Sequence, residues 1–221
     1  MHPRTIALAG PVVLVDMDGV TVDFFAGLQT KMAELIGASF KPLPLIACTK
    51  HIVQDVFDGG LSDIAHQLAR ESGFFRDLPP FPGAIEAITQ MAELYQVYLC
   101  TAPYHDNPTC ASDKFTWVRR HLGRDWCDRV VLAGGDKTLV RGDLLIDDKP
   151  VVVGNHQPTW KHLHFDNGCA YCRPSCGVVS INWSNWRQVI ERQLQQTEYQ
   201  QFVARGMNEA RQWRCPSSLD D

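Results

Sequence analysis

The stretch VVLVDMDGVTVDFF, residues Val12–Phe25, decides the fold of this chain. Its four apolar residues Val12–Val15 predict a short buried strand. Asp16 and Asp18 follow directly, and Gly19 begins a turn. An extended backbone would put both carboxylates on one face, whereas a turn at Gly19 would let Asp18 swing above Asp16. One carboxylate could then attack an electrophile while the other handles a proton.

Composition and charge limit the classes of protein to which this chain could belong. The 221 residues are 45% hydrophobic and 21% charged, which is ordinary for a globular chain. The net charge of −4 disfavours binding to nucleic acid or to an anionic membrane. No apolar run approaches the roughly 20 residues of a membrane span. The N-terminal stretch MHPRTIALAGP is too short and too weakly basic to predict a signal or transit peptide. We therefore expect a cytoplasmic protein without nucleic-acid or membrane partners.

Strand and helix patterns alternate from Pro79 onward, and this alternation predicts a mostly parallel sheet. The expected strands are Val12–Val15, Val97–Cys100, Val130–Leu132, Leu144–Ile146 and His162–Phe165. The expected helices are Asp23–Ile36, Leu61–Glu71, Ala84–Leu94, Ser112–His121 and Trp183–Gln195. The segment between the first strand and Pro82 is too long for a loop, which predicts a small helical insertion.

Polar residues follow three of these strands. Asp16 and Asp18 follow the first, Thr101 the second, and Asp147-Asp148 the fourth. Ligands of open α/β sheets bind outside the carboxyl ends of the strands, so these groups should converge. Clustered carboxylates repel one another, and a divalent cation such as Mg²⁺ would relieve that repulsion. Lys137, in GGDKT, is the expected cationic partner of a phosphate.

Each feature has an ordinary explanation when taken alone. Asp and Gly are common turn residues, so a four-residue D-x-D-G match arises by chance. Asp147-Asp148 could be a solvated strand end, Thr101 could cap a turn, and Lys137 could lie on the surface. Four such features in order favour a catalytic site.

The ordered segments DMDGV, TAP, DKT and LLIDD resemble the four motifs of the haloacid-dehalogenase-like phosphatases. The flanking segments GFFRDLPPFPGA, KFTWVRRHLG, PTWKHLHF and NWSNWRQVI narrow the resemblance to the 5′(3′)-deoxyribonucleotidases. The similarity runs from about Val12 to Glu191 and is weak across residues 38–70.

The resemblance implies an α/β fold of the haloacid-dehalogenase type. Residues 1–22 and 78–195 would form a Rossmann-like core, with helices on both faces of a mostly parallel sheet. Residues 23–77 would form a small helical cap, and residues 196–221 a helical extension with a frayed tail. The resemblance also implies a homodimer.

The resemblance assigns roles to the acids. Asp16 would attack the phosphorus of a nucleoside monophosphate and form an aspartyl-phosphate. Asp18 would protonate the leaving nucleoside oxygen and later activate water. One Mg²⁺ would be held by Asp16, the backbone carbonyl of Asp18 and Asp147, with Asp148 ordering metal-bound water.

The same resemblance implies a substrate site. Thr101, Ala102 and Lys137 would surround the phosphate. Phe24 and Phe75 would line the nucleoside pocket, where an apolar wall near C2′ would select deoxyribose. The alternative for both phenylalanines is ordinary core packing.

Because of three departures from the family pattern, the resemblance does not determine which substrate is preferred. Ala102 stands where the family usually has Ser, Gly134-Gly135 where it has Thr-Arg, and the usual aromatic near Ala69 is missing. A phosphatase of the same chemistry acting on another small phosphoester is therefore the alternative.

A cysteine–histidine cluster offers a third hypothesis. The segment HLHFDNGCAYCRPSC holds candidate tetrahedral zinc ligands, namely His162, His164, Cys169, Cys172 and Cys176. They could form a structural zinc site or a non-catalytic zinc-binding module, or could be reduced loop cysteines beside a strand histidine.

Overall fold

The computed structural model describes residues 10–47, 53–170, 173 and 177–197. The chain divides after Ser184 into two compact units, which are described separately. The second unit contains a helix over residues 186–197, so the helix predicted from Trp183 begins three residues later. Most of the predicted extension over 196–221 lies outside the described residues. Within the described ranges, no helix has the length and apolar character needed to span a membrane.

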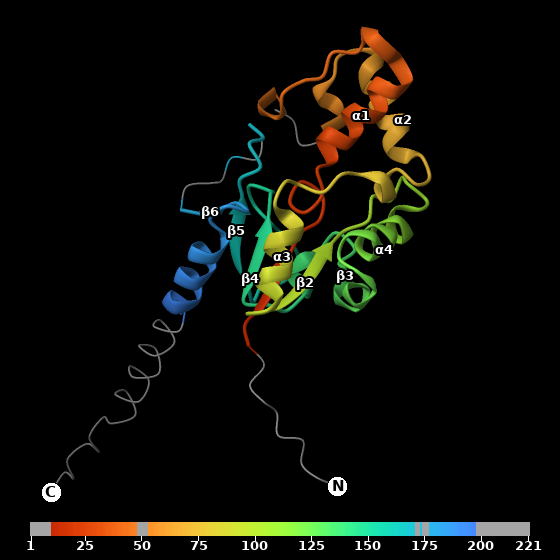
Figure 1. Ribbon diagram of the computed structural model, residues 1–221. Coiled ribbons are helices and arrows are strands. Elements are labelled where there is room, and N and C mark those ends of the chain that lie inside the picture. The colour runs from red at the N-terminus through yellow and green to blue at the C-terminus, as the bar shows by residue number, and fades with distance from the viewer. Residues whose placement is uncertain (1–9, 48–52, 171–172, 174–176, 198–221) are drawn as a thin grey trace, which may run out of the picture. The chain divides into compact units, whose positions relative to one another are not determined.

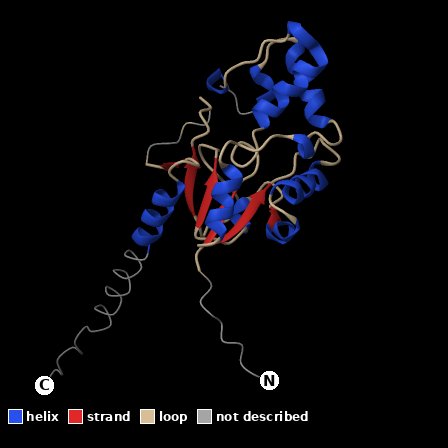
Figure 2. Ribbon diagram, viewed as in Figure 1, coloured by secondary structure: helices blue, strands red, loops and turns tan. Residues whose placement is uncertain are grey.

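A six-stranded sheet forms the centre of the first unit (Figures 1 and 2). The strand order is β3-β2-β1-β4-β5-β6, and every pairing between neighbours is parallel. The strands are β1 (Val12–Val15), β2 (Gln96–Thr101), β3 (Val130–Leu132), β4 (Leu144–Asp147), β5 (Lys161–Phe165) and β6 (Val179–Ile181). The predicted α/β fold with a mostly parallel sheet is confirmed.

The described residues of this unit also contain four α-helices and six short 3-10 helices. The α-helices are α1 (Phe24–Ile36), α2 (Gly60–Arg70), α3 (Ala84–Ala92) and α4 (Cys110–His121). The 3-10 helices are η1 (Gly37–Ser39), η2 (Leu45–Ala47), η3 (Val53–Val56), η4 (Phe75–Asp77), η5 (Arg124–Arg129) and η6 (Lys137–Leu139).

The strand and helix predictions differ from the structure mainly at their ends. β2 and β4 run one residue further than predicted, so Thr101 and Asp147 are the last residues of strands. α4 begins two residues earlier, at Cys110. β6 was not predicted, because three residues are too few to show a strand period.

Local sequence explains how β1 leads into α1. Val13, Leu14 and Val15 are buried, as expected for a strand covered on both faces. The Asp23 carboxylate accepts a hydrogen bond of 2.9 Å from the Ala26 N–H and so caps α1. The helix ends at Gly37, whose φ of 76° favours glycine.

Both faces of the sheet are covered. On one face Leu14, Cys100, Leu145 and Trp160 form a buried cluster. α4 contributes Trp117, which is fully buried and donates through its indole N–H to the Leu78 carbonyl at 2.8 Å. β1 therefore lies deep in the core.

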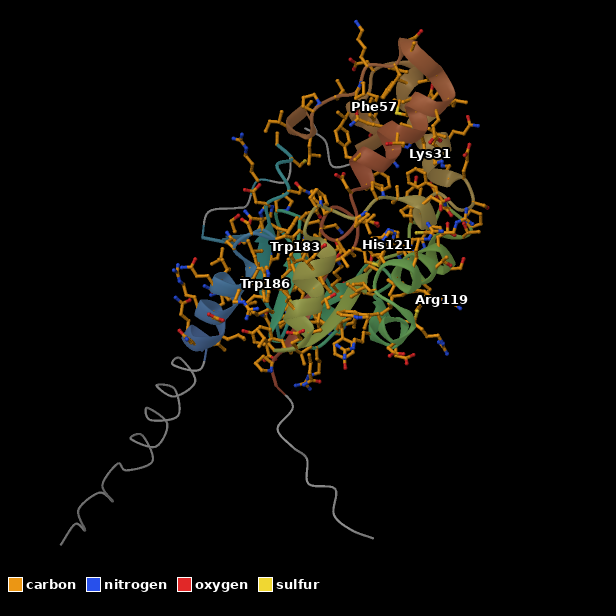
Figure 3. The ribbon with its side chains drawn as sticks, viewed as in Figure 1. Lys31, Phe57, Arg119, His121, Trp183 and Trp186 are labelled. Atoms are coloured by element: carbon orange, nitrogen blue, oxygen red, sulfur yellow. The ribbon has the colours of Figure 1, made fainter. Side chains whose placement is uncertain are left out.

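Residues between β1 and α3 form α1, α2 and several 3-10 turns beyond the carboxyl ends of the strands (Figure 1). This segment has an aromatic centre of its own. The ring of Phe57 (Figure 3) lies 6.0 Å from Phe25 and 6.3 Å from Phe40, measured between centroids. The helical insertion is present, whereas the boundaries of a cap at residues 23 and 77 stay a prediction.

Candidate functional site

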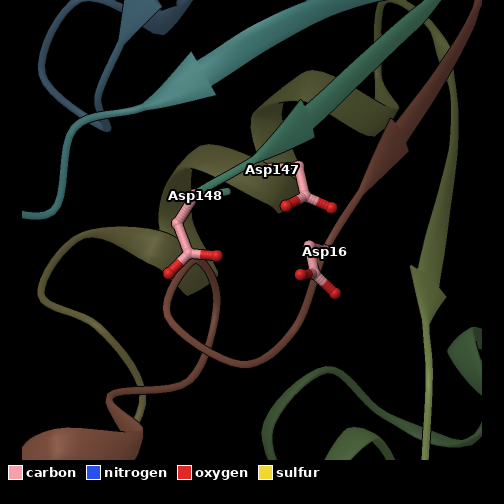
Figure 4. Close-up of side chains that lie close together, drawn as sticks. All are labelled: Asp16, Asp147 and Asp148. Atoms are coloured by element: carbon pink, nitrogen blue, oxygen red, sulfur yellow. The ribbon is translucent and has the colours of Figure 1, made fainter. Parts of the chain in front are cut away.

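Three carboxylates meet at the carboxyl edge of the sheet, where β1 and β4 lie side by side (Figure 4). Asp16 follows β1, and its N–H continues the ladder by donating to the Ile146 carbonyl at 2.9 Å. Asp147 ends β4 and Asp148 follows it. One oxygen from each of the three carboxylates lies within 4.8 Å of the others. Strands β1 and β4 lie where the strand order reverses, which is the usual ligand position in such sheets.

A tight turn carries the chain away from Asp16. The Met17 carbonyl accepts from the N–H groups of Val20, Thr21 and Val22 at 3.2, 2.8 and 2.8 Å. Gly19 has a φ of 79°, and a Cβ at this position would collide with the Asp148 carboxylate. Glycine is therefore required here both by the backbone conformation and by the close approach of Asp148.

Lys137 lies between two of the acids. Its Nζ contacts Asp16 Oδ1 at 2.7 Å and Asp147 Oδ2 at 2.6 Å, and its side chain is 4% exposed. Burial raises the pKa of Asp16, although Lys137 opposes that shift. Burial would also raise the pKa of Asp147, but its contacts with Lys137, together with the N–H and charge of Lys149, hold that pKa below its usual value. The two carboxylates in turn raise the pKa of Lys137 despite its burial.

Asp148 is the third acid of the cluster, and its pKa shifts in the opposite direction from that of Asp147. Burial, and then the charges of Asp147 and Asp16, raise the pKa of Asp148 well above its usual value. The amide of Asn167 donates to Asp148 Oδ2 at 3.2 Å and to the Gly19 carbonyl at 2.9 Å. Three carboxylates clustered this closely repel one another, and a cation could neutralise their negative charge.

The Asp18 carboxylate contacts a different lysine from the one beside Asp16. Its Oδ2 lies 2.6 Å from Nζ of Lys114, which comes from α4 and is 1% exposed. The same Nζ donates to Thr101 Oγ1 at 2.7 Å and to the Ala102 carbonyl at 3.2 Å. The structure thus brings together Asp18, Thr101 and Ala102 as predicted, but through a lysine that sequence reasoning did not assign. Nothing in DKFTW marks that lysine, because exposed lysines are common on helices.

Aromatic rings adjoin Lys114. Phe24 is half-buried, and its ring centroid lies 5.5 Å from Phe74 and 5.9 Å from Phe75. Phe75 is 3% exposed, contacts the ring of Tyr104 at 6.2 Å and has the Lys114 ammonium 5.6 Å from its centroid. Phe24 and Phe75 therefore lie together, Phe75 lies beside the lysine that contacts Asp18, and Tyr104 is a neighbour that sequence reasoning missed.

The predicted zinc cluster is only partly visible. Cys172 and Cys176 lie outside the described residues. His162 and His164 contact the backbone carbonyls of Asp147 and Asp148 at 3.3 and 3.1 Å. Among the described residues, the acids at the sheet edge are the one set of three potential metal-ligating side chains that lies close together. A zinc site stays a prediction.

Comparison with known proteins matches this chain to one family. The family model for "5' nucleotidase, deoxy (Pyrimidine), cytosolic type C protein" matches residues 10–197. The human cytosolic-type 5′(3′)-deoxyribonucleotidase is 37% identical over 190 residues, which cover 81% of this chain and 92% of the human protein. The mouse mitochondrial 5′(3′)-deoxyribonucleotidase is 39% identical over 162 residues, covering 69% of this chain and 71% of that protein.

The solved structures agree on the fold. A haloacid dehalogenase-like hydrolase from Burkholderia xenovorans LB400 superposes with a TM-score of 0.50 at 15% identity, covering 84% of this chain and 99% of that one. This similarity establishes the architecture, while the matches in sequence establish the closer relationship. The chain therefore belongs to the 5′(3′)-deoxyribonucleotidases, a family of haloacid-dehalogenase-like phosphatases.

Proposed function

We propose that this enzyme is a Mg²⁺-dependent phosphomonoesterase that hydrolyses nucleoside monophosphates, with deoxyribonucleotides as its preferred substrates. One observation carries the proposal within the phosphatase family. Asp16, Asp147 and Asp148 converge at the carboxyl edge of the sheet, with Asp18 held beside them by Lys114. Asp16, as the nucleophile, and the cation would occupy the acid cluster. Asp18, as the proton donor, would act from its position against Lys114.

The acid cluster fits a magnesium ion. All its donors are oxygens, which Mg²⁺ prefers. Lys137 opposes their mutual repulsion through its contacts with Asp16 and Asp147, and a bound cation would oppose it further. Asp16, Asp147 and the Asp18 carbonyl would hold the ion, and Asp148 would order its water. The ion would supply positive charge to neutralise the phosphate oxygens.

The reaction would proceed in two displacements on Asp16. A carboxylate oxygen of Asp16 forms a bond to phosphorus, while the bond between phosphorus and the nucleoside oxygen breaks. The Asp18 carboxyl gives its proton to that oxygen, and the nucleoside leaves. Asp18 then takes a proton from water, whose oxygen bonds to phosphorus as the aspartyl-phosphate bond breaks. Phosphate and free Asp16 remain.

Substrate recognition would come from two sides of the site. Thr101 and Lys137, which are both buried at the carboxyl edge of the sheet, would hold phosphate oxygens. Ala102 would contribute backbone only. Phe24 and Phe75 would form the apolar wall for the sugar, where a ribose 2′-hydroxyl would lose water without gaining a partner.

Another small phosphoester is the second candidate. Ala102 lacks the hydroxyl usual at its position, and Gly135 lacks a basic side chain. No atom would lie within 4 Å of a Cβ at Gly135, so this part of the site is open. Membership of a phosphatase family disfavours the non-catalytic zinc-binding module.

The test is phosphate release from a panel of deoxyribonucleotides, ribonucleotides and sugar phosphates. Wild type and Asp16→Asn are each measured with Mg²⁺ and with EDTA. We expect wild type to hydrolyse deoxyribonucleotides fastest and to lose activity in EDTA. We expect Asp16→Asn to be inactive, because an amide cannot form the phosphoenzyme.

Asp128→Asn is the matched control, since this carboxylate is exposed and lies away from the acid cluster. Its activity should equal that of wild type. Turnover by Asp16→Asn would refute the nucleophile assignment. Faster release from sugar phosphates would favour the second candidate, and full activity in EDTA would exclude a required metal.

The cellular setting is also a proposal. The relative named as cytosolic type supports a cytoplasmic location for this chain. The homodimer implied by the family resemblance stays a prediction, as does the absence of nucleic-acid and membrane partners.

A further inference from the structure

Lys114 is an unusual lysine for a helix. Its side chain is 1% exposed, although lysine is almost never buried without a partner. An ammonium group has three N–H donors. Here three acceptors surround it: Asp18 Oδ2 at 2.6 Å, Thr101 Oγ1 at 2.7 Å and the Ala102 carbonyl at 3.2 Å. The helix α4 thereby contacts the loops that follow β1 and β2.

The two oxygens of Asp18 have different surroundings. Oδ2 contacts Lys114. Oδ1 is buried and has no hydrogen-bond partner among the described residues. A buried polar atom without a partner is costly and calls for an explanation. The leaving oxygen of a substrate would provide the missing partner, because a general acid needs one anchored oxygen and one oxygen free to carry the proton.

Thr101 is oriented by the same contact. Its Oγ1 accepts from Lys114, so its own hydroxyl hydrogen must point elsewhere. That hydrogen is then available to donate to a phosphate oxygen. Lys114 is separate from Lys137, which contacts Asp16 and Asp147 instead.

We propose that Lys114 is a positioning residue, which fixes the Asp18 carboxylate toward the leaving oxygen. This inference rests on the proposed function, in which Asp18 is the general acid. An ordinary structural ion pair would explain the burial of Lys114. It would not explain why one oxygen of Asp18 is anchored while the other is buried without a partner.

The leaving group distinguishes the two explanations. A nucleoside alkoxide must receive a proton as it departs, whereas p-nitrophenolate is stable enough to depart without one. General acid catalysis typically contributes about 10²–10⁴-fold. We therefore expect Lys114→Met to lower kcat/KM for a deoxyribonucleoside monophosphate by about 10²-fold, and for p-nitrophenyl phosphate by less than about 5-fold.

A double-mutant comparison tests whether Lys114 acts through Asp18. Asp18→Asn should show the same leaving-group pattern, and Asp18→Asn with Lys114→Met should be little worse than Asp18→Asn alone, because residues that act as a unit are not additive. Lys161→Met is the matched control. Lys161 is exposed at the amino end of β5, opposite the site, and its loss should change neither substrate.

Each outcome decides the matter. Equal losses on both substrates, or additive losses in the double variant, would overturn the positioning role while leaving the proposed function intact. A wild type that hydrolyses neither substrate would overturn the proposed function and this inference with it. If Lys114→Met does not fold, as judged by circular dichroism, Lys114→Gln is assayed for the same ratio of the two losses.

Discussion

Replacing Lys137 by Met tests how the acid cluster is held together without a metal. The substitution keeps the length of the side chain but removes the charge that lies between Asp16 and Asp147. Because the lysine is only 4% exposed, water cannot replace it without a rearrangement of the core. We expect a large loss of stability in metal-free protein at pH 7.

The size of the loss follows from the contact distances. At separations of 2.7 and 2.6 Å, each pair is worth about 6 kcal/mol by Coulomb's law at an effective dielectric constant of about 20. Part of this is offset because water is stripped from the ions on burial. Breaking a buried pair by removing one partner costs about 3–5 kcal/mol, and this is the loss we expect.

The loss should depend on pH. In wild type the contacts with Lys137 hold the pKa of Asp147 below its ordinary value of 3.8. This stabilisation is fully present above that value and is lost as the pH falls through the folded-state pKa. The difference between wild type and Lys137→Met should therefore shrink below about pH 4.

The assay is urea denaturation in EDTA at pH 7 and at about pH 3, repeated at pH 7 with Mg²⁺. Magnesium at about 100 times its Kd should recover about 2.7 kcal/mol in the variant, because it binds the folded cluster alone. Lys161→Met is the control for loss of an exposed lysine. The reasoning would be refuted if the free energy of unfolding of the variant lay within about 1 kcal/mol of that of wild type in EDTA at pH 7. Two buried acids that have lost their lysine should destabilise the fold by more than that.

Two further predictions concern other parts of the first unit. Gly19→Ala should lower the free energy of unfolding in urea by about 1–3 kcal/mol, because the backbone φ at this position is left-handed and a Cβ would displace Asp148. The substitution should also weaken Mg²⁺ binding measured by calorimetry. Gly10→Ala, whose Cβ would meet nothing within 4 Å, should be neutral, and equal effects would contradict the argument. Burial, and then the charge of Arg120, lowers the pKa of His121 (Figure 3) below 6.5, so stability should fall as the pH drops through 6.5 toward the folded-state pKa. His121→Gln should lose less stability than wild type between pH 7.5 and 5.5 in thermal melts, and parallel losses would show that another group titrates.

Much of the fold could be predicted from local pattern. The run Val12–Val15, apolar and followed by Asp16, is short enough to be a strand and too apolar to lie at a surface. Periodicity also located α1 and α4 to within two residues. It missed β6, because three residues with one buried side chain carry no period. Element ends are set by tertiary hydrogen bonds, so Thr101 and Asp147 joined strands only in the folded sheet.

By itself, the sequence determined that Asp16, Asp18 and Asp147 follow strands, and parallel strands bring such residues to one edge. Only the tertiary structure decided which acid meets which lysine. The DKT motif marked Lys137 but nothing marked Lys114, and the motif did not show that Lys137 contacts Asp16 and Asp147 while Lys114 contacts Asp18. The physical reason is that an ion pair between residues 96 positions apart depends on where α4 packs against the sheet, and no local pattern encodes that placement.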